Sequence, residues 1–111
     1  TEADIDLVGA IPGSGPAYVF RFMEALEKAG IKRGLPPEAE HAPALGTVLG
    51  AAVLADKSGE AFSKLRENVT SKGGTTAKAL EVMNNRDIDG MMDEAVNAAL
   101  KRTAEMKALF R

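Results

Sequence analysis

The spacing of apolar residues is the feature that most constrains how this chain of 111 residues can fold. No window alternates apolar and polar residues over the length of a strand, whereas apolar residues recur repeatedly at steps of three and four. Such steps place side chains on one face of a helix. The pattern therefore predicts an all-α fold, a helical bundle of about five helices.

Prolines and glycines indicate where these helices begin and end. The predicted helices cover residues 14–30, 36–58, 60–68, 77–84 and 88–109. Pro16 suits a first helical turn, and Gly30 suits a left-handed helix end. Pro43 should kink the second helix or delay its start. In the third helix we expect Phe62 and Leu65 to point inward.

Two of the predicted helices, over residues 36–58 and 88–109, carry wide apolar faces. The chain has only four Phe and one Tyr to fill a core. A monomer would leave part of those faces exposed, so we expect a homodimer whose helices pack across the interface. A compact monomer of five helices is the alternative, because a wide apolar stripe is also ordinary core.

Composition excludes several classes of site. There are no cysteines and one histidine, His41, so no disulfide, thiolate metal site, multi-histidine metal site or cysteine nucleophile is predicted. We expect His41 at the surface. The net charge of -2 argues against nucleic acid as a partner. No run of apolar residues is long enough to span a membrane, and the acidic start is unlike a signal peptide, so we expect a cytoplasmic protein.

The segment between the third and fourth predicted helices is the most informative one. Two consecutive glycines, Gly73 and Gly74, allow successive N–H groups to point into one concavity just before a helix, where N–H groups are unpaired. The hydroxyls of Ser71, Thr75 and Thr76 add polar groups that suit a carboxylate or a phosphate. The alternative interpretation is a simple helix cap, in which Thr75 or Thr76 is the N-cap and the glycines only form the turn.

A second glycine-containing segment precedes the first predicted helix. Gly13 and Gly15 flank Ser14, but the third glycine and the preceding strand of a dinucleotide-binding motif are missing. On this pattern the segment is a rigid turn and a helix start. We interpret Tyr18, one turn into that helix, as a packing residue.

Two long motifs carry a resemblance to a known family. They are residues 10–20, AIPGSGPAYVF, and residues 65–76, LRENVTSKGGTT. In this order they resemble segments of the C-terminal domain of pyrroline-5-carboxylate reductases, and the resemblance covers nearly the whole chain. It implies an interlocked homodimer, which in many members assembles further into a ring of dimers. It also implies that the whole enzyme reduces 1-pyrroline-5-carboxylate to L-proline with NADPH or NADH, the last step of proline biosynthesis.

The resemblance also implies roles for single residues. Residues 1–111 would form the dimerisation and substrate-binding domain, without the N-terminal Rossmann domain that holds most of the cofactor, and this domain alone should be inactive. The substrate carboxylate would be bound by the loop that contains Ser71, Gly73, Gly74 and Thr75, with the Ser71 hydroxyl and the Gly74 and Thr75 N–H groups as donors. Thr76 would be the catalytic residue, because its hydroxyl would hydrogen-bond the ring nitrogen of the imine.

The same resemblance places further residues beside the cofactor. They are Ser14, Gly15, Pro16 and Asn68. The chain departs from the family pattern at Pro12, Pro43, Gly46 and Lys72. Two other functions stay open. The chain could be the helical oligomerisation module of a related dehydrogenase with a different small acid as substrate, or a structural helical oligomerisation module without catalytic activity of its own.

Overall fold

The computed structural model describes residues 1–109, apart from the side chains of residues 2, 3, 6–8, 10, 12 and 40. The side chain of Pro12, one of the departures named above, thus lies outside the described residues. The described part contains five α-helices and no strand, which confirms the predicted all-α class. They are α1 (Glu2–Lys32), α2 (Pro37–Ser58), α3 (Phe62–Asn68), α4 (Thr75–Asn85) and α5 (Ile88–Leu109).

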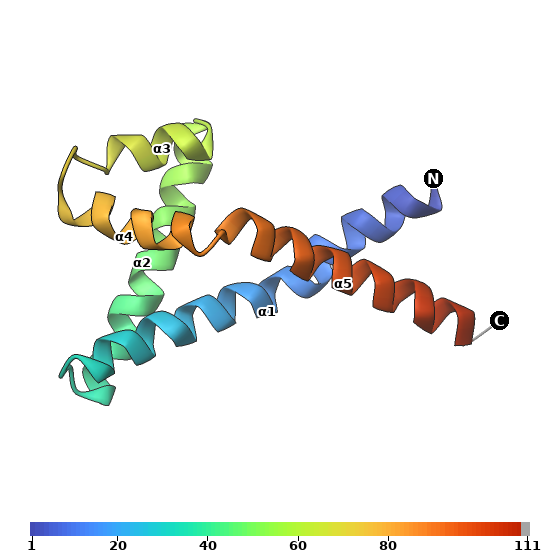
Figure 1. Ribbon diagram of the computed structural model, residues 1–111, viewed down its shortest axis with the longest axis horizontal. Helices are drawn as coiled ribbons and strands as arrows, with labels where there is room; N and C mark the ends of the chain where they lie inside the picture. The colour runs from blue at the N-terminus through green and yellow to red at the C-terminus, as the bar shows by residue number, and fades with distance from the viewer. Residues whose placement is uncertain (110–111) are drawn as a thin grey trace.

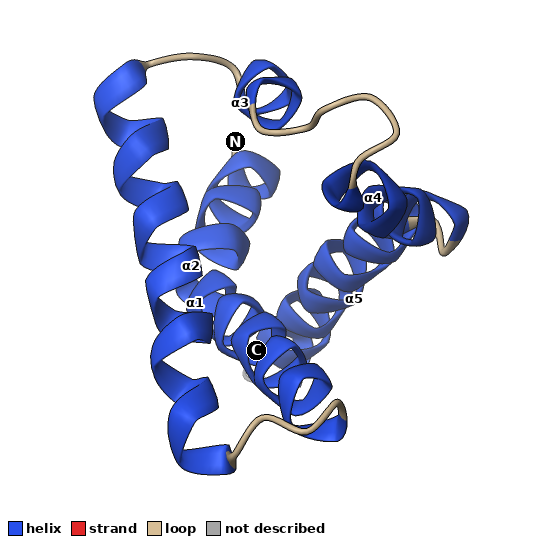
Figure 2. Ribbon diagram, turned by 90° about the vertical axis from the view of Figure 1, so that its left-hand side faces the viewer, coloured by secondary structure: helices blue, strands red, loops and turns tan. Residues whose placement is uncertain are grey.

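The longest helix, α1, organises the others. It packs against α2 along one side and against α5 along another, and α4 contacts α5. Figure 1 shows α1 and α5 crossing like the arms of an X, with the start of α1 and the end of α5 on the same side of the molecule. The α3–α4 segment lies at the opposite side in Figure 1, and Figure 2 shows α3 at the top and α4 across from α2.

The end of the second helix and both ends of the last helix agree with the prediction. The helix α2 ends at Gly59, whose φ of 67° is left-handed and whose N–H donates to the Ala55 carbonyl. The bounds of α5 are those predicted. Because α2 begins at Pro37, Pro43 lies inside it and does not delay its start. The Thr47 hydroxyl donates to the Pro43 carbonyl at 2.7 Å.

The predicted start and end of the first helix are both wrong. The helix α1 begins at Glu2, because Thr1 and Asp4 form a capping box: the Thr1 hydroxyl accepts from the Asp4 N–H and the Asp4 carboxylate accepts from the Thr1 amino group. Pro16 therefore lies within a helix. The left-handed glycine after α1 is Gly34, with φ of 106°, and Gly30 lies inside the helix.

The chain by itself is open. Its accessible surface is 8856 Å², whereas a folded monomer of 11.7 kDa exposes about 5,900 Å². Its radius of gyration is 17.1 Å, against about 13 Å for a compact domain of this length. Among the described residues, only Ala44 is a buried hydrophobic residue. This chain is therefore not the compact five-helix monomer that its sequence left open.

The expected core of the third helix is correspondingly incomplete. Leu65 is half-buried, but Phe62 is 81% exposed and does not point into a core of this chain. Many other large apolar side chains are exposed on α2 and α5. The reason is geometric, because α3 is a single short helix at one side of an open arrangement and no second layer covers it.

The start of α5 depends on a close contact between Asp87 and Gly90. The Asp87 carboxylate accepts from the Gly90 N–H at 3.1 Å, as an N-cap residue does, and Asp87 itself has φ of 54°. A Cβ built on Gly90 would collide with the Asp87 carboxylate. An alanine at position 90 would therefore require the Asp87 carboxylate to move from its present position.

We predict that Gly90→Ala destabilises the protein, although alanine normally favours a helix interior by about 1 kcal/mol. Asp87→Ala should also cost about 1 kcal/mol, from loss of the cap. Asp87→Gly is the matched control, because glycine tolerates the positive φ and costs only a few tenths of a kcal/mol as an N-cap. Urea unfolding at fixed protein concentration measures all three variants. A more stable Gly90→Ala variant would contradict this cap geometry.

Candidate functional site

The loop between α3 and α4 begins with hydrogen bonds to the last turn of α3. The Thr70 N–H donates to the Glu67 carbonyl at 3.1 Å, and the Thr70 hydroxyl donates to the Arg66 carbonyl at 2.6 Å. These bonds satisfy carbonyl groups that the last turn of α3 leaves unpaired. Asn68, the last residue of α3, is therefore held directly before the loop.

The middle of the loop is a tight turn that contains two glycines, and Gly73 has the left-handed conformation. Gly73 has a φ of 73°, a backbone conformation that residues with a Cβ rarely adopt. The Gly74 N–H donates to the Ser71 carbonyl at 3.1 Å, and a Cβ on Gly74 would lie 2.5 Å from the Ser71 Oγ. Gly74 thus allows the Ser71 side chain to fold against the start of α4.

The N-cap of α4 is Gly74, which has no side chain with which to cap the helix. The interpretation of Thr75 or Thr76 as the cap is therefore wrong, because they occupy the first two helical positions. Their backbone N–H groups lie at the positive end of the helix, where the first N–H groups have no intrahelical acceptor. Within the described chain, neither threonine hydroxyl takes part in a hydrogen bond.

The surroundings of this turn are polar and accessible. Ser71, Lys72, Thr75 and Thr76 are exposed, and Gly74 is half-buried. Lys72 adds a positive charge beside the helix end, whereas Lys78 is paired with Glu81 at 3.6 Å. Hydroxyls, unpaired N–H groups and a cation together suit a carboxylate or phosphate. The described residues supply this end with donors but leave it open to solvent.

The residues expected beside the cofactor lie in two places. Asn68 adjoins the loop, but Ser14, Gly15 and Pro16 lie inside α1, so the predicted turn before a helix is wrong there. In Figure 1 that part of α1 lies near the crossing with α5, whereas the loop lies at the far left. One chain does not bring these two groups of residues together. A Cβ on Gly15 would meet no atom within 4 Å, so this stretch of α1 is open to an approaching group.

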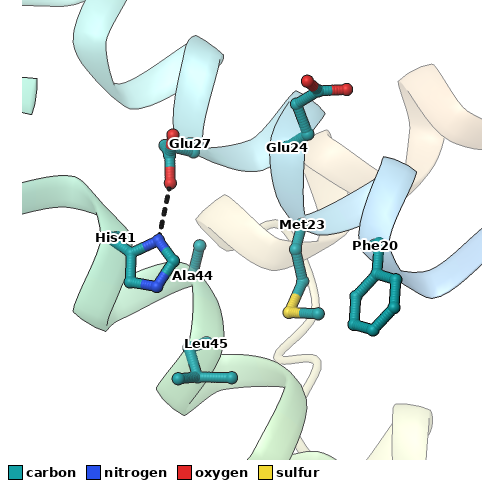
Figure 3. A pocket seen from close by; sticks show the side chains of 7 residues that line it. All are labelled: Phe20, Met23, Glu24, Glu27, His41, Ala44 and Leu45. Atoms are coloured by element: carbon teal, nitrogen blue, oxygen red, sulfur yellow. Dashed lines mark hydrogen bonds and ion pairs between the residues drawn. The ribbon is translucent and has the colours of Figure 1, made fainter. Parts of the chain in front are cut away.

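Two features near α1 were not predicted. The Tyr18 side chain is half-buried, as packing requires, but its hydroxyl is buried without a hydrogen-bond partner among the described residues. His41 is exposed, as predicted, and its Nδ1 lies 3.2 Å from the Glu27 carboxylate. This pair joins α2 to α1 at the rim of a pocket of about 420 Å³, which Figure 3 shows with its apolar side chains Phe20, Met23, Ala44 and Leu45. Sequence spacing contains no signal for a contact between residues so far apart.

Two searches of the described residues concern metals and membranes. No three His, Cys, Asp or Glu side chains of the described part gather in a way that could hold a metal ion. None of the helices in that part is long and apolar enough to cross a membrane.

Residues 2–106 match the family described as pyrroline-5-carboxylate reductase dimerisation. The chain belongs to this family. Pyrroline-5-carboxylate reductase 2 of Bacillus subtilis is 41% identical over 109 residues, which are 98% of this chain and 39% of that protein. The pyrroline-5-carboxylate reductase of Vibrio alginolyticus is 43% identical over 110 residues, 98% of this chain and 40% of that protein. The chain thus spans about two-fifths of the length of these relatives.

Solved structures of the family share the fold. A pyrroline-5-carboxylate reductase from Coxiella burnetii has a TM-score of 0.90 and 39% identity, covering 95% of this chain and 39% of its own. The pyrroline carboxylate reductase of Plasmodium falciparum, solved with NADP bound, has a TM-score of 0.89 and 36% identity, covering 96% of this chain and 40% of its own. This dimerisation domain is therefore homologous to pyrroline-5-carboxylate reductases over nearly its whole length.

The left-handed conformation of Gly73 in this dimerisation domain can be tested by substitution. Gly73→Ala should lower the free energy of unfolding by about 1–2 kcal/mol, because an L-residue in that conformation places its Cβ against the following carbonyl. Gly73→Asn should cost less, since asparagine tolerates the left-handed region. Thermal unfolding of both variants at equal concentration measures the difference. Equal stability of the alanine variant and the parent would show that the turn does not adopt this φ.

Proposed function

We propose that this chain is the C-terminal dimerisation and substrate-binding domain of a pyrroline-5-carboxylate reductase, which reduces 1-pyrroline-5-carboxylate to L-proline with NADPH or NADH. The observation that supports it most is the turn from Ser71 to Gly74 at the start of α4. That turn leaves hydroxyl and N–H donors unpaired at a positive helix end, in a chain whose family carries this activity. A cyclic imine that bears a carboxylate needs such donors.

The geometry changes one part of the expected carboxylate contact. The Gly74 N–H already donates to Ser71, so it is not a free donor for the substrate. The donors that remain are the Ser71 hydroxyl and the N–H groups of Thr75 and Thr76. Gly73 and Gly74 then act through conformation, because they form the turn that presents these groups. Lys72 adds electrostatic attraction for the carboxylate.

Thr76 is the proposed catalytic residue. Its hydroxyl, uncommitted in the chain, would hydrogen-bond the imine nitrogen while the carboxylate is anchored one residue away. A donor at nitrogen favours positive charge there and makes the adjacent carbon more electrophilic. When bound, the reduced nicotinamide supplies the hydride that this carbon accepts. Ser14, Gly15, Pro16 and Asn68 are the residues proposed to lie beside it.

Both groups of residues can line one site only if two protomers combine. Ser14–Pro16 and the α3–α4 loop lie apart within one chain, as Figure 1 shows. The accessible surface exceeds that of a compact monomer by about 3,000 Å², far more than the roughly 800 Å² per partner of a standard interface. We therefore infer a homodimer, with a higher ring of dimers as a further expectation.

A structural oligomerisation module is the second candidate, favoured by the large exposed apolar faces of α2 and α5. In that case the loop would be a turn with no role in substrate binding or catalysis. The two functions differ in what they require of Thr76, whose side chain contributes no cap to α4. Removal of its hydroxyl should therefore leave folding intact and affect only a catalytic role.

We predict that Thr76→Ala in the enzyme that carries this domain lowers kcat/KM by a factor on the order of 10²–10³, since positioned proton donors typically contribute that much. Thr76→Ser retains the hydroxyl and should recover most of the rate. Steady-state kinetics with 1-pyrroline-5-carboxylate, together with a melting curve for each variant, provides the measurement. Unchanged kinetics in Thr76→Ala would favour the purely structural module.

The homodimer has its own test. Light scattering of the chain in solution should give about twice 11.7 kDa, or a multiple of that dimer. Repeating the measurement with proline present tests whether ligand affects assembly. A clean monomer over the accessible concentration range would contradict the inference from exposed surface.

A further inference from the structure

Lys72 carries a positive charge in the turn that precedes α4. Its side chain is exposed, and among the described residues it takes part in no ion pair. No acidic residue occurs in the sequence between Glu67 and Glu81, and Glu81 is paired with Lys78 at 3.6 Å. The charge of Lys72 is therefore not neutralised by the segment in which it lies.

The geometry of this turn does not require a lysine. The Gly74 N–H donates to the Ser71 carbonyl, which makes Lys72 and Gly73 the two central residues of a four-residue turn. Gly73 has a φ of 73° and Lys72 has no positive φ, a combination typical of a type II turn. Proline is favoured at the position of Lys72, because its ring fixes the φ that the turn needs. The Lys72 N–H donates to no other described residue, so even a proline would break no hydrogen bond there.

The position of Lys72 among hydrogen-bond donors gives its charge a role. The Ser71 hydroxyl precedes it, and the N–H groups of Thr75 and Thr76 follow it at the positive end of α4. A lysine ammonium is a compact charge on a flexible four-carbon stem. It can therefore move toward an anion that these donors hold, without a fixed geometry of its own.

We propose that Lys72 determines how tightly the α3–α4 loop captures the carboxylate of its substrate, and that this capture weakens as ionic strength rises. The proposal rests on the function proposed above. Hydride transfer to the imine carbon leaves the charge of the carboxylate unchanged, so Lys72 attracts the bound substrate and the transition state equally. Such uniform binding lowers KM and leaves kcat unchanged. Lys72 thus differs from Thr76, whose proposed role is at the reacting atoms.

The first experiment compares Lys72→Gln with the parent in the enzyme that carries this domain, with 1-pyrroline-5-carboxylate as substrate. At low ionic strength, loss of the charge should raise KM about two- to fivefold, as for other attractions between solvated charges, and leave kcat unchanged. Lys72→Arg retains the charge and should keep KM within about twofold of the parent.

Lys32→Gln is the matched control for this charge change. Lys32 is an exposed lysine in the last turn of α1, and among the described residues it takes part in no ion pair. It lies outside the residues proposed for the substrate and the cofactor. Its replacement should leave both KM and kcat unchanged.

A salt series tests the electrostatic origin of the effect. Raising the ionic strength from about 0.01 M to about 1 M shortens the Debye length from about 30 Å to about 3 Å. The KM of the parent should therefore rise toward that of Lys72→Gln, whose own KM should change less. At the highest ionic strength the two enzymes should have similar KM values.

Lys72→Pro tests whether position 72 acts through the shape of the turn. Proline suits this position and restricts the unfolded chain, so it should raise the folding equilibrium constant about two- to fivefold, as measured by urea unfolding. Its KM should nevertheless rise as in Lys72→Gln, because the charge is gone. A parental KM in Lys72→Pro would show that the turn and not the charge matters, and would overturn the proposal.

The outcomes separate this proposal from the proposed function. A parent enzyme that does not reduce 1-pyrroline-5-carboxylate would overturn both. An active parent whose Lys72→Gln variant keeps the parental KM at low ionic strength, or loses kcat instead, would overturn the role of Lys72 alone. A raised KM in Lys72→Gln and Lys72→Pro, with unchanged kcat and a smaller dependence on salt, would support it.

Discussion

Burial of α2 is the constraint on which the rest of the structure depends. The helix packs one face on α1 around Ala44 and leaves its other apolar side chains exposed. Covering these apolar side chains would remove them from water, which favours association. Association also costs about 4–15 kcal/mol in lost rotational and translational freedom, so only the surplus of burial over that cost appears as affinity. An open single chain is thus consistent with a stable protein only when the chain has a partner.

The open shape also explains which parts of the fold the sequence could predict. The end of α2 at Gly59 and the bounds of α5 depend on local rules, namely a left-handed glycine and a run of helical spacing. The inward position of Phe62 was wrong because burial depends on what lies across from a helix, and one chain supplies nothing there. The predicted start of α1 was wrong because proline suits a first helical turn but does not require one, and the capping box of Thr1 and Asp4 starts the helix well before Pro16.

The candidate site was also predictable only in part. The left-handed Gly73 follows from the Gly-Gly pair, since glycine is the residue that adopts positive φ without strain. A threonine N-cap was offered because a threonine hydroxyl can accept from the first N–H groups of a helix, whereas the turn closed by Ser71 and Gly74 starts the helix at Thr75, two residues before the predicted start. The contact of His41 with Glu27 joins two helices, and helical periodicity is silent about such pairs.

Assembly and substrate binding are coupled by solvent exposure. A helix end in water stabilises an anion by about 0.3–1 kcal/mol, which is too little to hold a carboxylate firmly. The same N–H groups and hydroxyls interact more strongly with an anion once water is excluded, because the effective dielectric constant falls. The α3–α4 loop is exposed in one chain, and Ser14–Pro16 lie elsewhere on it. In the homodimer inferred above, a second chain would both cover exposed apolar side chains and provide the walls that such a loop needs for tight binding.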